Sequence, residues 1–351
     1  MARSAQDRHV TDTPARVLDG HDSTGDGAEP ATSVCHVVHD EAIGEVELTR
    51  ERAERLLASG SFFWLDLHRP TGDDFAILHD VFAFHPLALE DSEHFDQRPK
   101  IDEYDDFVFL VVFGAVSDED RLVEVHCFYS ERYLVTIHRD DAPAFAAARE
   151  RYQKRREPIR SPGLLLYRII DSLVDSFFPI LAEIDNRIDE VEDQVFVQAS
   201  DEQLQEIFAM KRLLVGMRKA VTPQRDMFAS LMGGVADLPG MTAESERYFR
   251  DVYDHLIRIS DLIDTYRDLL TSSMDVFLST VSNRLNVVMK QLAVIATIFL
   301  PLTFITGFFG QNFGWLVRHI GGWPEFLVFG IVVEVATVVA MMLFFKRRGW
   351  F

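Results

Sequence analysis

Polar and small side chains recur along one line of a long helical pattern in the C-terminal third of the sequence. At alternating spacings of four and three, the line contains Asp261, Thr265, Asp268, Ser272, Asp275, Ser279, Ser282, Asn286, Met289, Ala293, Ala296, Leu300, Thr303 and Gly307. A mean spacing of 3.5 residues keeps one edge of a helix facing the axis of a left-handed bundle for many turns. Hydroxyl, amide and small groups on such an edge can line a hydrated path for an ion.

We call this line the polar seam, and it has two interpretations. It is either a solvated face that continues into a closely packed membrane helix, or the wall of an ion path shared by several copies of the chain. In the second case the lining residues are Asp275, Asn286, Met289, Leu292, Ala296, Leu300, Thr303 and Gly307. Met289, Leu292 and Leu300 would then form apolar constrictions that gate by dewetting. Lipid or helix packing is the alternative role for Met289 and Leu300.

Two apolar segments are long enough to cross a membrane as helices. The first, Leu292–Phe309, carries no charge, and the second, Phe326–Phe345, carries only Glu334. Two spans in one chain cannot enclose a pore, so an ion path requires a homo-oligomer.

Basic residues flank both spans on the same side. Arg284 and Lys290 precede the first span, and residues 346–348 are Lys-Arg-Arg, whereas the connecting loop holds one Arg and one Glu. Because short cytoplasmic segments are enriched in Lys and Arg, we expect both termini in the cytoplasm and the loop outside. This arrangement fits a multi-pass protein of the cell (inner) membrane.

Composition excludes several other classes of function. The chain has 35 basic and 56 acidic residues, a net charge of −21, which repels nucleic acid and attracts cations. The segment Cys35-His36-Val37-Val38-His39 resembles a metal cluster, but a strand would point Cys35 and His36 to opposite faces. We find no Walker lysine motif, nucleophile elbow or HExxH motif, and we therefore do not expect an enzyme.

The patterning predicts an α+β membrane protein. β-branched and aromatic runs predict strands in the segments SVCHVVH, FFWLDLH, FVFLVVFGAV, LVEVHCFYS and YLVTIH. Helices are expected after the N-cap Thr49, over Asp140–Arg156, and from Leu164 almost to the membrane, with interruptions near Ser200, Thr222-Pro223 and GGVADLPG. A second line on the last helix, from Leu256 to Val288, supplies apolar packing.

We divide the chain into seven parts. They are a disordered tail (1–33), a cytoplasmic α/β domain (34–160), a cytoplasmic helical region (161–241), a stalk helix continuing into the first span (242–309), an external loop (310–325), the second span (326–345) and a basic cytoplasmic tail (346–351).

Two long segments carry a family resemblance. IATIFLPLTFITGFFGQNFG, preceded by YFRDVYDHLIRISDLIDTYRDLLTSSMDVFLSTVSNRLNVVMK, resembles the CorA family of magnesium transporters. HPLALEDSEHFDQRPKIDEYDDFVFLVV resembles the cytoplasmic domain of that family. The resemblance implies a homopentameric funnel, a stalk helix that continues into the pore-lining first span, and an outer second span.

The family signature after the first span is Gly-Met-Asn, and here it is Gly310-Gln311-Asn312. The resemblance implies a ring of Asn312 amides at the outer mouth. Gln311 departs from the signature, and branches with other middle residues are associated with zinc. We expect influx of Mg²⁺, and also of Co²⁺ or Ni²⁺, with a Zn²⁺ transporter as the alternative. A membrane-anchored scaffold or ion sensor that does not conduct is the alternative from another class.

The resemblance also implies regulatory cation sites between neighbouring cytoplasmic domains. The matching acidic residues are Glu90, Asp91 and Asp251, with Asp175 as an addition. Intracellular Mg²⁺ bound there would stabilise the closed assembly. Without the resemblance, Glu90 and Asp91 would simply end a short helix.

Glu334 has no counterpart in the resemblance. A carboxyl group in the middle of a span is costly and marks a functional candidate. Counting along the helix places Glu334 near Pro301, whose missing N–H leaves the Thr297 carbonyl without its helical donor. We expect a protonated Glu334 that donates to that carbonyl or to Thr303 and so joins the two spans.

Overall fold

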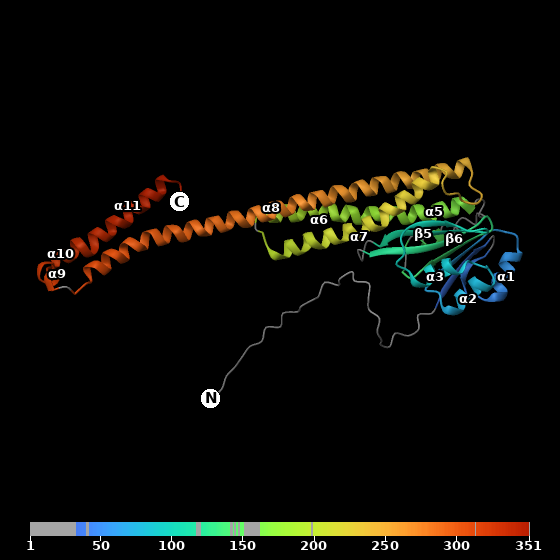
Figure 1. Ribbon diagram of the computed structural model, residues 1–351, viewed down its shortest axis with the longest axis horizontal. Helices are drawn as coiled ribbons and strands as arrows, with labels where there is room; N and C mark the ends of the chain where they lie inside the picture. Colours follow the sequence, from blue (N-terminus) through green and yellow to red (C-terminus); the bar gives the residue numbers. More distant parts are fainter. Residues whose placement is uncertain are drawn as a thin grey trace, which may run out of the picture.

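The computed structural model describes residues 33–350 apart from 40–41, 117–120, 141–142, 144, 147, 151–161, 198 and 313. An α/β domain lies at one end of an elongated molecule, and a helical hairpin lies at the other (Figure 1). One helix, α8 (Ala243–Phe309), connects the two ends. The expected tail over 1–33 lies, except for Ser33, outside the described residues, as does much of the helix expected over 140–156.

The α/β domain is built on a seven-stranded sheet of order β2-β1-β3-β7-β6-β5-β4. β3 and β7 are parallel, and the other neighbouring pairs are antiparallel. The strands are β1 (Val34–His39), β2 (Ala42–Val46), β3 (Phe63–His68), β4 (Lys100–Glu103), β5 (Val108–Val116), β6 (Arg121–Tyr129) and β7 (Tyr133–His138). All five expected strands are present.

The two strands that the patterning missed, β2 and β4, are the edges of the sheet. β2 is AIGEV and β4 is KIDE, and neither has a run of β-branched or aromatic residues. Short, charged strands are common at sheet edges because they discourage pairing with other chains. Because β2 and β4 lie at the edges of the sheet, they lack the β-branched and aromatic runs by which the buried strands are predicted from sequence.

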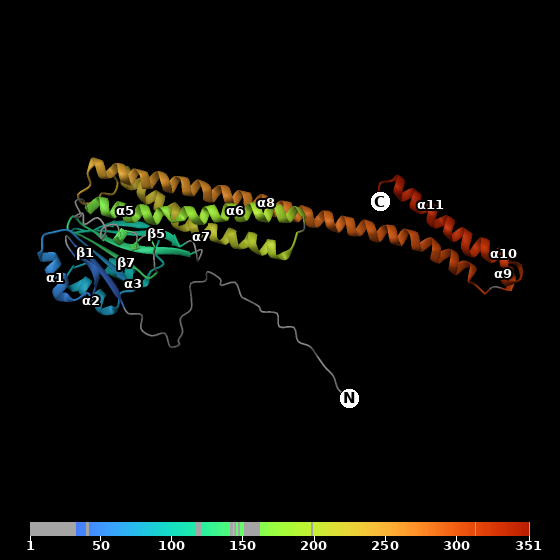
Figure 2. The same ribbon diagram turned by 180° about the vertical axis from the view of Figure 1, so that it is seen from behind.

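Helices cover both faces of the sheet (Figure 2). One face packs against α1 (Arg50–Ala58), α2 (Gly72–Asp80) and α3 (Pro86–His94), and the other faces the long helices. Side chains alternate between these two cores along β5, where Val111 belongs to the first core and Leu110 and Val112 to the second. Thr49 caps α1 as expected, because its side chain accepts a hydrogen bond from the Arg52 N–H.

Cys35 is buried in the core with α1 to α3, and burial raises the pKa of its thiol to about 12. A thiol that stays protonated is a poor metal ligand. The structure thus agrees with a core role for the Cys35–His39 segment.

The long helices are α5 (Pro162–Asp175), α6 (Phe177–Val197), α7 (Asp201–Met232) and the first half of α8. At Gly114 a Cβ atom would lie 2.8 Å from the Leu173 side chain, so the absence of a side chain lets α5 approach β5 closely. The Gln224 side chain ties α7 to the same strand, accepting from the Phe113 N–H at 2.6 Å and donating to the Phe113 carbonyl at 3.3 Å.

The interruption expected near Thr222-Pro223 is wrong, because α7 continues through Pro223 to Met232. A proline inside a helix removes one backbone hydrogen bond, which costs about 3 kcal/mol when nothing compensates. Here the neighbouring residues Val221 and Gln224 are fully buried, and tertiary packing holds the helix together. The breaks expected near Ser200 and in GGVADLPG are confirmed between α6 and α7 and between α7 and α8.

A buried carboxylate, Asp66 on β3, connects the sheet to the helical residues 148–150. It accepts hydrogen bonds from Thr136 at 2.7 Å and His138 at 3.1 Å, and it pairs with Arg149. Burial opposes the charge of Asp66, but the hydrogen bond and charge of His138, together with the Arg149 charge and the Thr136 hydrogen bond, outweigh it and lower the pKa of the carboxyl. A charge removed from water in this way is stabilised only while its partners remain.

The hairpin end contains α9 (Gly314–His319), α10 (Trp323–Glu325), the π-helix η2 (Phe326–Val332) and α11 (Val333–Arg347). By length and composition, α8 and the continuous helical stretch Trp323–Arg347 are able to cross a membrane. Almost none of either apolar stretch is buried within the chain, unlike a core helix of a soluble protein.

Candidate ion path and regulatory site

Two segments of α8 differ in their surroundings. The packed segment, residues 243–277, begins at Thr242, whose side chain caps the helix together with that of Ser245. Eleven of its residues, among them Leu256 and Phe277, are buried against α5, α6 and α7. In the uncovered segment, residues 278–309, only Val294 is buried. The second line of apolar residues therefore packs within the chain as far as Phe277, whereas Leu285 and Val288 are exposed.

The polar seam is exposed along its whole length. Each residue expected to line an ion path is exposed in the single chain: Asp275, Asn286, Met289, Leu292, Ala296, Leu300, Thr303 and Gly307. Leu300 is 73% exposed and Met289 64%. Exposing apolar side chains such as Leu300 and Met289 to water is unfavourable, so lipid or other copies of the chain must cover this edge of α8.

The threonine hydroxyls of the uncovered segment are satisfied by their own helix. Thr303 Oγ1 donates to the Phe299 carbonyl at 2.9 Å, and Thr297 Oγ1 donates to the Ala293 carbonyl at 2.7 Å. A hydroxyl whose hydrogen is used in this way keeps lone pairs as acceptors. Thr303 on the seam therefore offers an acceptor to a water molecule, such as one in the hydration shell of a cation.

Gly310-Gln311-Asn312 forms the turn that ends α8. The Gly310 N–H donates to the Thr306 carbonyl at 2.9 Å, and a Cβ at Gly310 would lie 3.0 Å from that carbonyl oxygen. The tight approach explains why a residue without a side chain stands here. Gln311 and Asn312 are exposed, so their amides are available at the tip of the hairpin.

The other end of the hairpin closes near Lys290. Lys290 Nζ donates to the Gly349 carbonyl at 3.2 Å and lies 5.7 Å from the centre of the Trp350 ring. The start of the first span and the end of the second therefore meet at one level, as two antiparallel spans require.

Glu334 lies beside Thr306, not beside Thr303 or the Thr297 carbonyl. Thr306 Oγ1 is 2.8 Å from Glu334 Oε1 and also 2.8 Å from the Leu302 carbonyl oxygen. The expected partner is therefore wrong, although the expected contact between the two helices is present. The depth was counted with the rise of an α-helix, but the second span begins as the π-helix Phe326–Val332.

Asp171, Asp175 and His255 form a cluster on α5 and α8. One ligand atom from each lies within 4.8 Å of the others, and His255 Nδ1 is 3.0 Å from Asp175 Oδ1. Burial, then the charges of Asp175 and Asp251, raise the pKa of Asp171. Asp171 Oδ1 and His255 Nδ1 are both buried atoms, 4.0 Å apart. Carboxylate and imidazole groups in this arrangement form a donor set for a divalent cation, which would relieve the repulsion between the acids.

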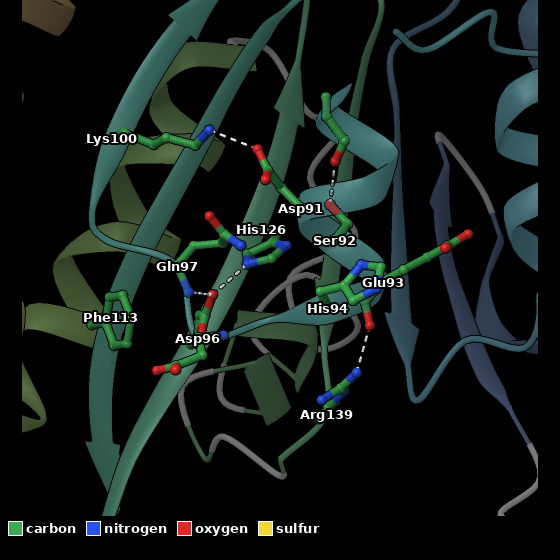
Figure 3. A network of polar contacts seen from close by, with 12 residues as sticks. Asp91, Ser92, Glu93, His94, Asp96, Gln97, Lys100, Phe113, His126 and Arg139 are labelled. Atoms are coloured by element: carbon green, nitrogen blue, oxygen red, sulfur yellow. Dashed lines mark hydrogen bonds and ion pairs between the residues drawn. The ribbon is translucent and has the colours of Figure 1, made fainter. Parts of the chain in front are cut away.

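Glu90 and Asp91 lie on α3, at the opposite face of the sheet from that cluster. Asp91 Oδ2 accepts from Lys100 Nζ at 2.7 Å (Figure 3), and the same ammonium group contacts Asp102 at 2.8 Å. Glu90 is exposed. The four acidic residues expected to regulate therefore form two pairs within one chain. Asp175 and Asp251 lie on α5 and α8, and Glu90 and Asp91 lie on the other side of the sheet.

Comparison with known proteins shows which family the chain belongs to. The family described as CorA-like Mg²⁺ transporter protein matches residues 59–347. The chain belongs to the CorA family.

Relatives of this CorA chain extend over most of its length. The cobalt/magnesium transport protein CorA of Thermotoga maritima is 38% identical over 277 residues, which are 77% of this chain and 78% of that protein. The corresponding protein of Methanocaldococcus jannaschii is 26% identical over 291 residues, 82% of this chain and 90% of that protein. The solved structure of the CorA magnesium transporter from M. jannaschii superposes with a TM-score of 0.76 at 23% identity, covering 92% of this chain and all of that chain.

Membership confirms the expected fold of this CorA chain: an α/β domain, a long helix that continues into the first apolar span, and a second apolar span. Its relatives are transporters and not enzymes. Sequence reasoning missed Asp171 and His255. Asp171 stands four residues before Asp175, and His255 four after Asp251, so each was one helical turn from a named residue.

Proposed function

We propose that the chain is a homopentameric channel-type transporter that admits Mg²⁺ across the cell membrane, with both termini in the cytoplasm. The observation that carries the proposal is the polar seam, which remains uncovered through the membrane segment and ends at Gly310-Gln311-Asn312. Copies arranged around an axis would cover this edge and enclose a hydrated path.

The chemistry of the seam suits a cation that keeps its water. Mg²⁺ dehydrates reluctantly and usually retains several waters. Amide oxygens of Asn312 and hydroxyl oxygens such as that of Thr303 accept hydrogen bonds from a hydration shell without removing it. From Asn286 to Asn312 the sequence has no Asp or Glu, so binding along the path stays weak enough for the ion to leave. A membrane potential negative inside drives a divalent cation inward with about 4.6 kcal/mol per 100 mV.

Regulation follows from the separation of the acidic residues. Glu90 and Asp91 face away from Asp175 and Asp251 in one chain, so a neighbouring copy must supply one pair if they act together. Mg²⁺ between two such copies would remove the repulsion of facing carboxylates and favour the closed assembly. Asp171 and His255 extend this site within each chain.

One observation favours a second ion. His255 brings an imidazole nitrogen to the cluster, and nitrogen suits Co²⁺, Ni²⁺ or Zn²⁺ better than Mg²⁺. Flux into liposomes with these ions in competition separates a magnesium transporter from a zinc transporter. A preference for Zn²⁺ would replace the proposed ion while leaving the proposed path in place.

The direct experiment is Asn312→Ala in liposomes loaded with a magnesium indicator. We expect the rate of Mg²⁺ entry to fall at least tenfold, because the outer mouth loses its amide oxygens, while the thermal unfolding temperature stays unchanged. The matched control is Gln291→Ala, which removes an exposed amide on the side of α8 that faces away from the seam. Unchanged flux in Asn312→Ala would favour a scaffold or sensor that does not conduct.

A further inference from the structure

A basic cleft lies between the α/β domain and the long helices. It encloses about 930 Å³ between the loop at 96–99, the strands β5 and β6, and helices α7 and α8. Five cationic side chains line it: Arg98, Arg121, Arg218, Lys219 and Arg267. Among the residues that the structure describes, Asp96 is the one acid in the lining. Such an accumulation of positive charge is unusual in a chain whose net charge is −21.

The carboxylates beside the cleft do not neutralise these cations. Arg218 and Arg267 share one carboxylate, Asp264, at 3.3 and 3.2 Å. Arg121 pairs with Asp140. Arg98 and Lys219 are exposed and form no ion pair with any residue that the structure describes. Among the described residues, five cations thus meet three carboxylates, Asp96, Asp140 and Asp264, and an anion would balance the remaining positive charge.

The loop that carries Arg98 is held in place before any ligand arrives. The Glu124 carboxylate accepts from the Asp96 N–H at 2.7 Å and the Gln97 N–H at 2.9 Å, and it also lies 2.7 Å from His126 Nε2. Figure 3 shows the three contacting residues, Asp96, Gln97 and His126, close together. Asp96 has a φ of 63°, a conformation that non-glycine residues seldom adopt without such support. A fixed loop loses little conformational entropy when a ligand binds.

The walls of the cleft are also apolar. The half-buried Phe113 and Leu122 line it from the sheet, and Leu213 and Val215 line it from α7. The Gln224 hydrogen bonds to Phe113 hold these two walls together. We propose that this cleft binds a nucleoside di- or triphosphate, with the ring system against the apolar wall and the phosphates on Arg98 and Lys219. The inference is independent of the proposed ion transport.

Size and position favour this class of ligand. Pockets for small molecules usually enclose 300–1,000 Å³. A lipid phosphate is excluded because Arg267 precedes the first apolar span, at Leu292, by 25 residues, about 37 Å along the helix. Nucleic acid would meet the strongly negative remainder of the chain, whereas a small anion reaches the cleft alone.

The test uses the full-length protein in detergent with fluorescent mant-ADP in magnesium-free buffer. We expect saturable binding that ADP and pyrophosphate displace and adenosine does not. The double variant Arg98→Ala/Lys219→Ala should bind at least tenfold more weakly. Arg212→Ala, which removes an exposed cation of the same helix outside the cleft, should change affinity less than twofold.

A second variant guards against misfolding. A Cβ at Gly216, in the cleft wall, meets no atom within 4 Å, so the first atom of a side chain has room there. Gly216→Leu should reduce the space in the cleft, and it removes a glycine from a helix interior. We expect this variant to lose mant-ADP binding while its unfolding temperature does not fall. Absence of saturable binding by the unaltered protein, or equal binding by Arg98→Ala/Lys219→Ala, would overturn the inference. Displacement by polyglutamate as effective as that by ADP would indicate an acidic protein partner instead.

Discussion

The packed and uncovered segments of α8 belong to one unbroken helix, yet they obtain their stability from different sources. In the packed segment, apolar residues such as Leu256 and Ile263 are buried by helices of the same chain. In the uncovered segment, residues of equal hydrophobicity, such as Leu285 and Leu300, are exposed. The α/β domain and the helices packed on it thus bury their apolar residues within one chain, whereas the hairpin end leaves most of its apolar residues exposed.

The polar groups show the same contrast. The Asp66 carboxylate in the α/β domain has three side-chain partners in its own chain: Thr136, His138 and Arg149. Glu334 in the second span has one side-chain partner among the described residues, Thr306. A carboxyl group within a span with a single partner is costly, and such groups usually face the interior of a helix bundle. We therefore expect Glu334 to make further contacts with a neighbouring helix if several copies of the chain assemble.

The largest expected effect tests the packing contrast. Leu256→Ala removes a fully buried side chain and should lower the free energy of unfolding by about 2–5 kcal/mol. Leu285→Ala, at 60% exposure, should leave the free energy of unfolding of the α/β domain and its packed helices within about 0.5 kcal/mol of the original. Urea unfolding in detergent, followed by circular dichroism, measures both. Equal losses would mean that the uncovered segment is stabilised within the single chain.

A smaller effect is expected at the cluster of α5 and α8. Asp171→Asn should weaken Co²⁺ binding about tenfold, or about 1.4 kcal/mol, as measured by calorimetry. Because the pKa of Asp171 is raised, protons compete with the metal at a higher pH than at an ordinary aspartate. Affinity should therefore fall as the pH is lowered, and the fall should begin at lower pH in Asp171→Asn. An unchanged affinity and pH profile would remove Asp171 from the site.

The smallest effect is expected at the contact between the spans. Thr306→Val removes the hydroxyl group beside Glu334 and should destabilise the hairpin by about 0.6 kcal/mol, the mean for hydrogen bonds between membrane helices. Glu334→Gln retains a donor and an acceptor and should preserve both assembly and flux. Loss of flux in Glu334→Gln with assembly intact would show that Glu334 acts on the ion and not between the helices.

Local signals predicted much of the fold. Thr49 was identifiable as a helix cap because capping depends on residues within one turn. The polar seam was visible because one helix carries it. The cluster of Asp171 and His255 was not, because it depends on α5 and α8, which are far apart in sequence. The partner of Glu334 was misplaced for a similar reason, since the register of two helices depends on the π-helix and turn between them.

Disulfide cross-linking along α8 tests the central claim most directly, because it reports which edge faces other copies. Single cysteines at the seam positions Ser279, Ser282 and Asn286 are compared with cysteines at Leu278 and Leu285, off the seam; the natural Cys35 and Cys127 are buried. On oxidation in membranes, we predict covalent dimers from the three seam positions and few from the other two. Equal cross-linking at all five positions, or cross-linking only at Leu278 and Leu285, would contradict a polar seam that faces a shared axis.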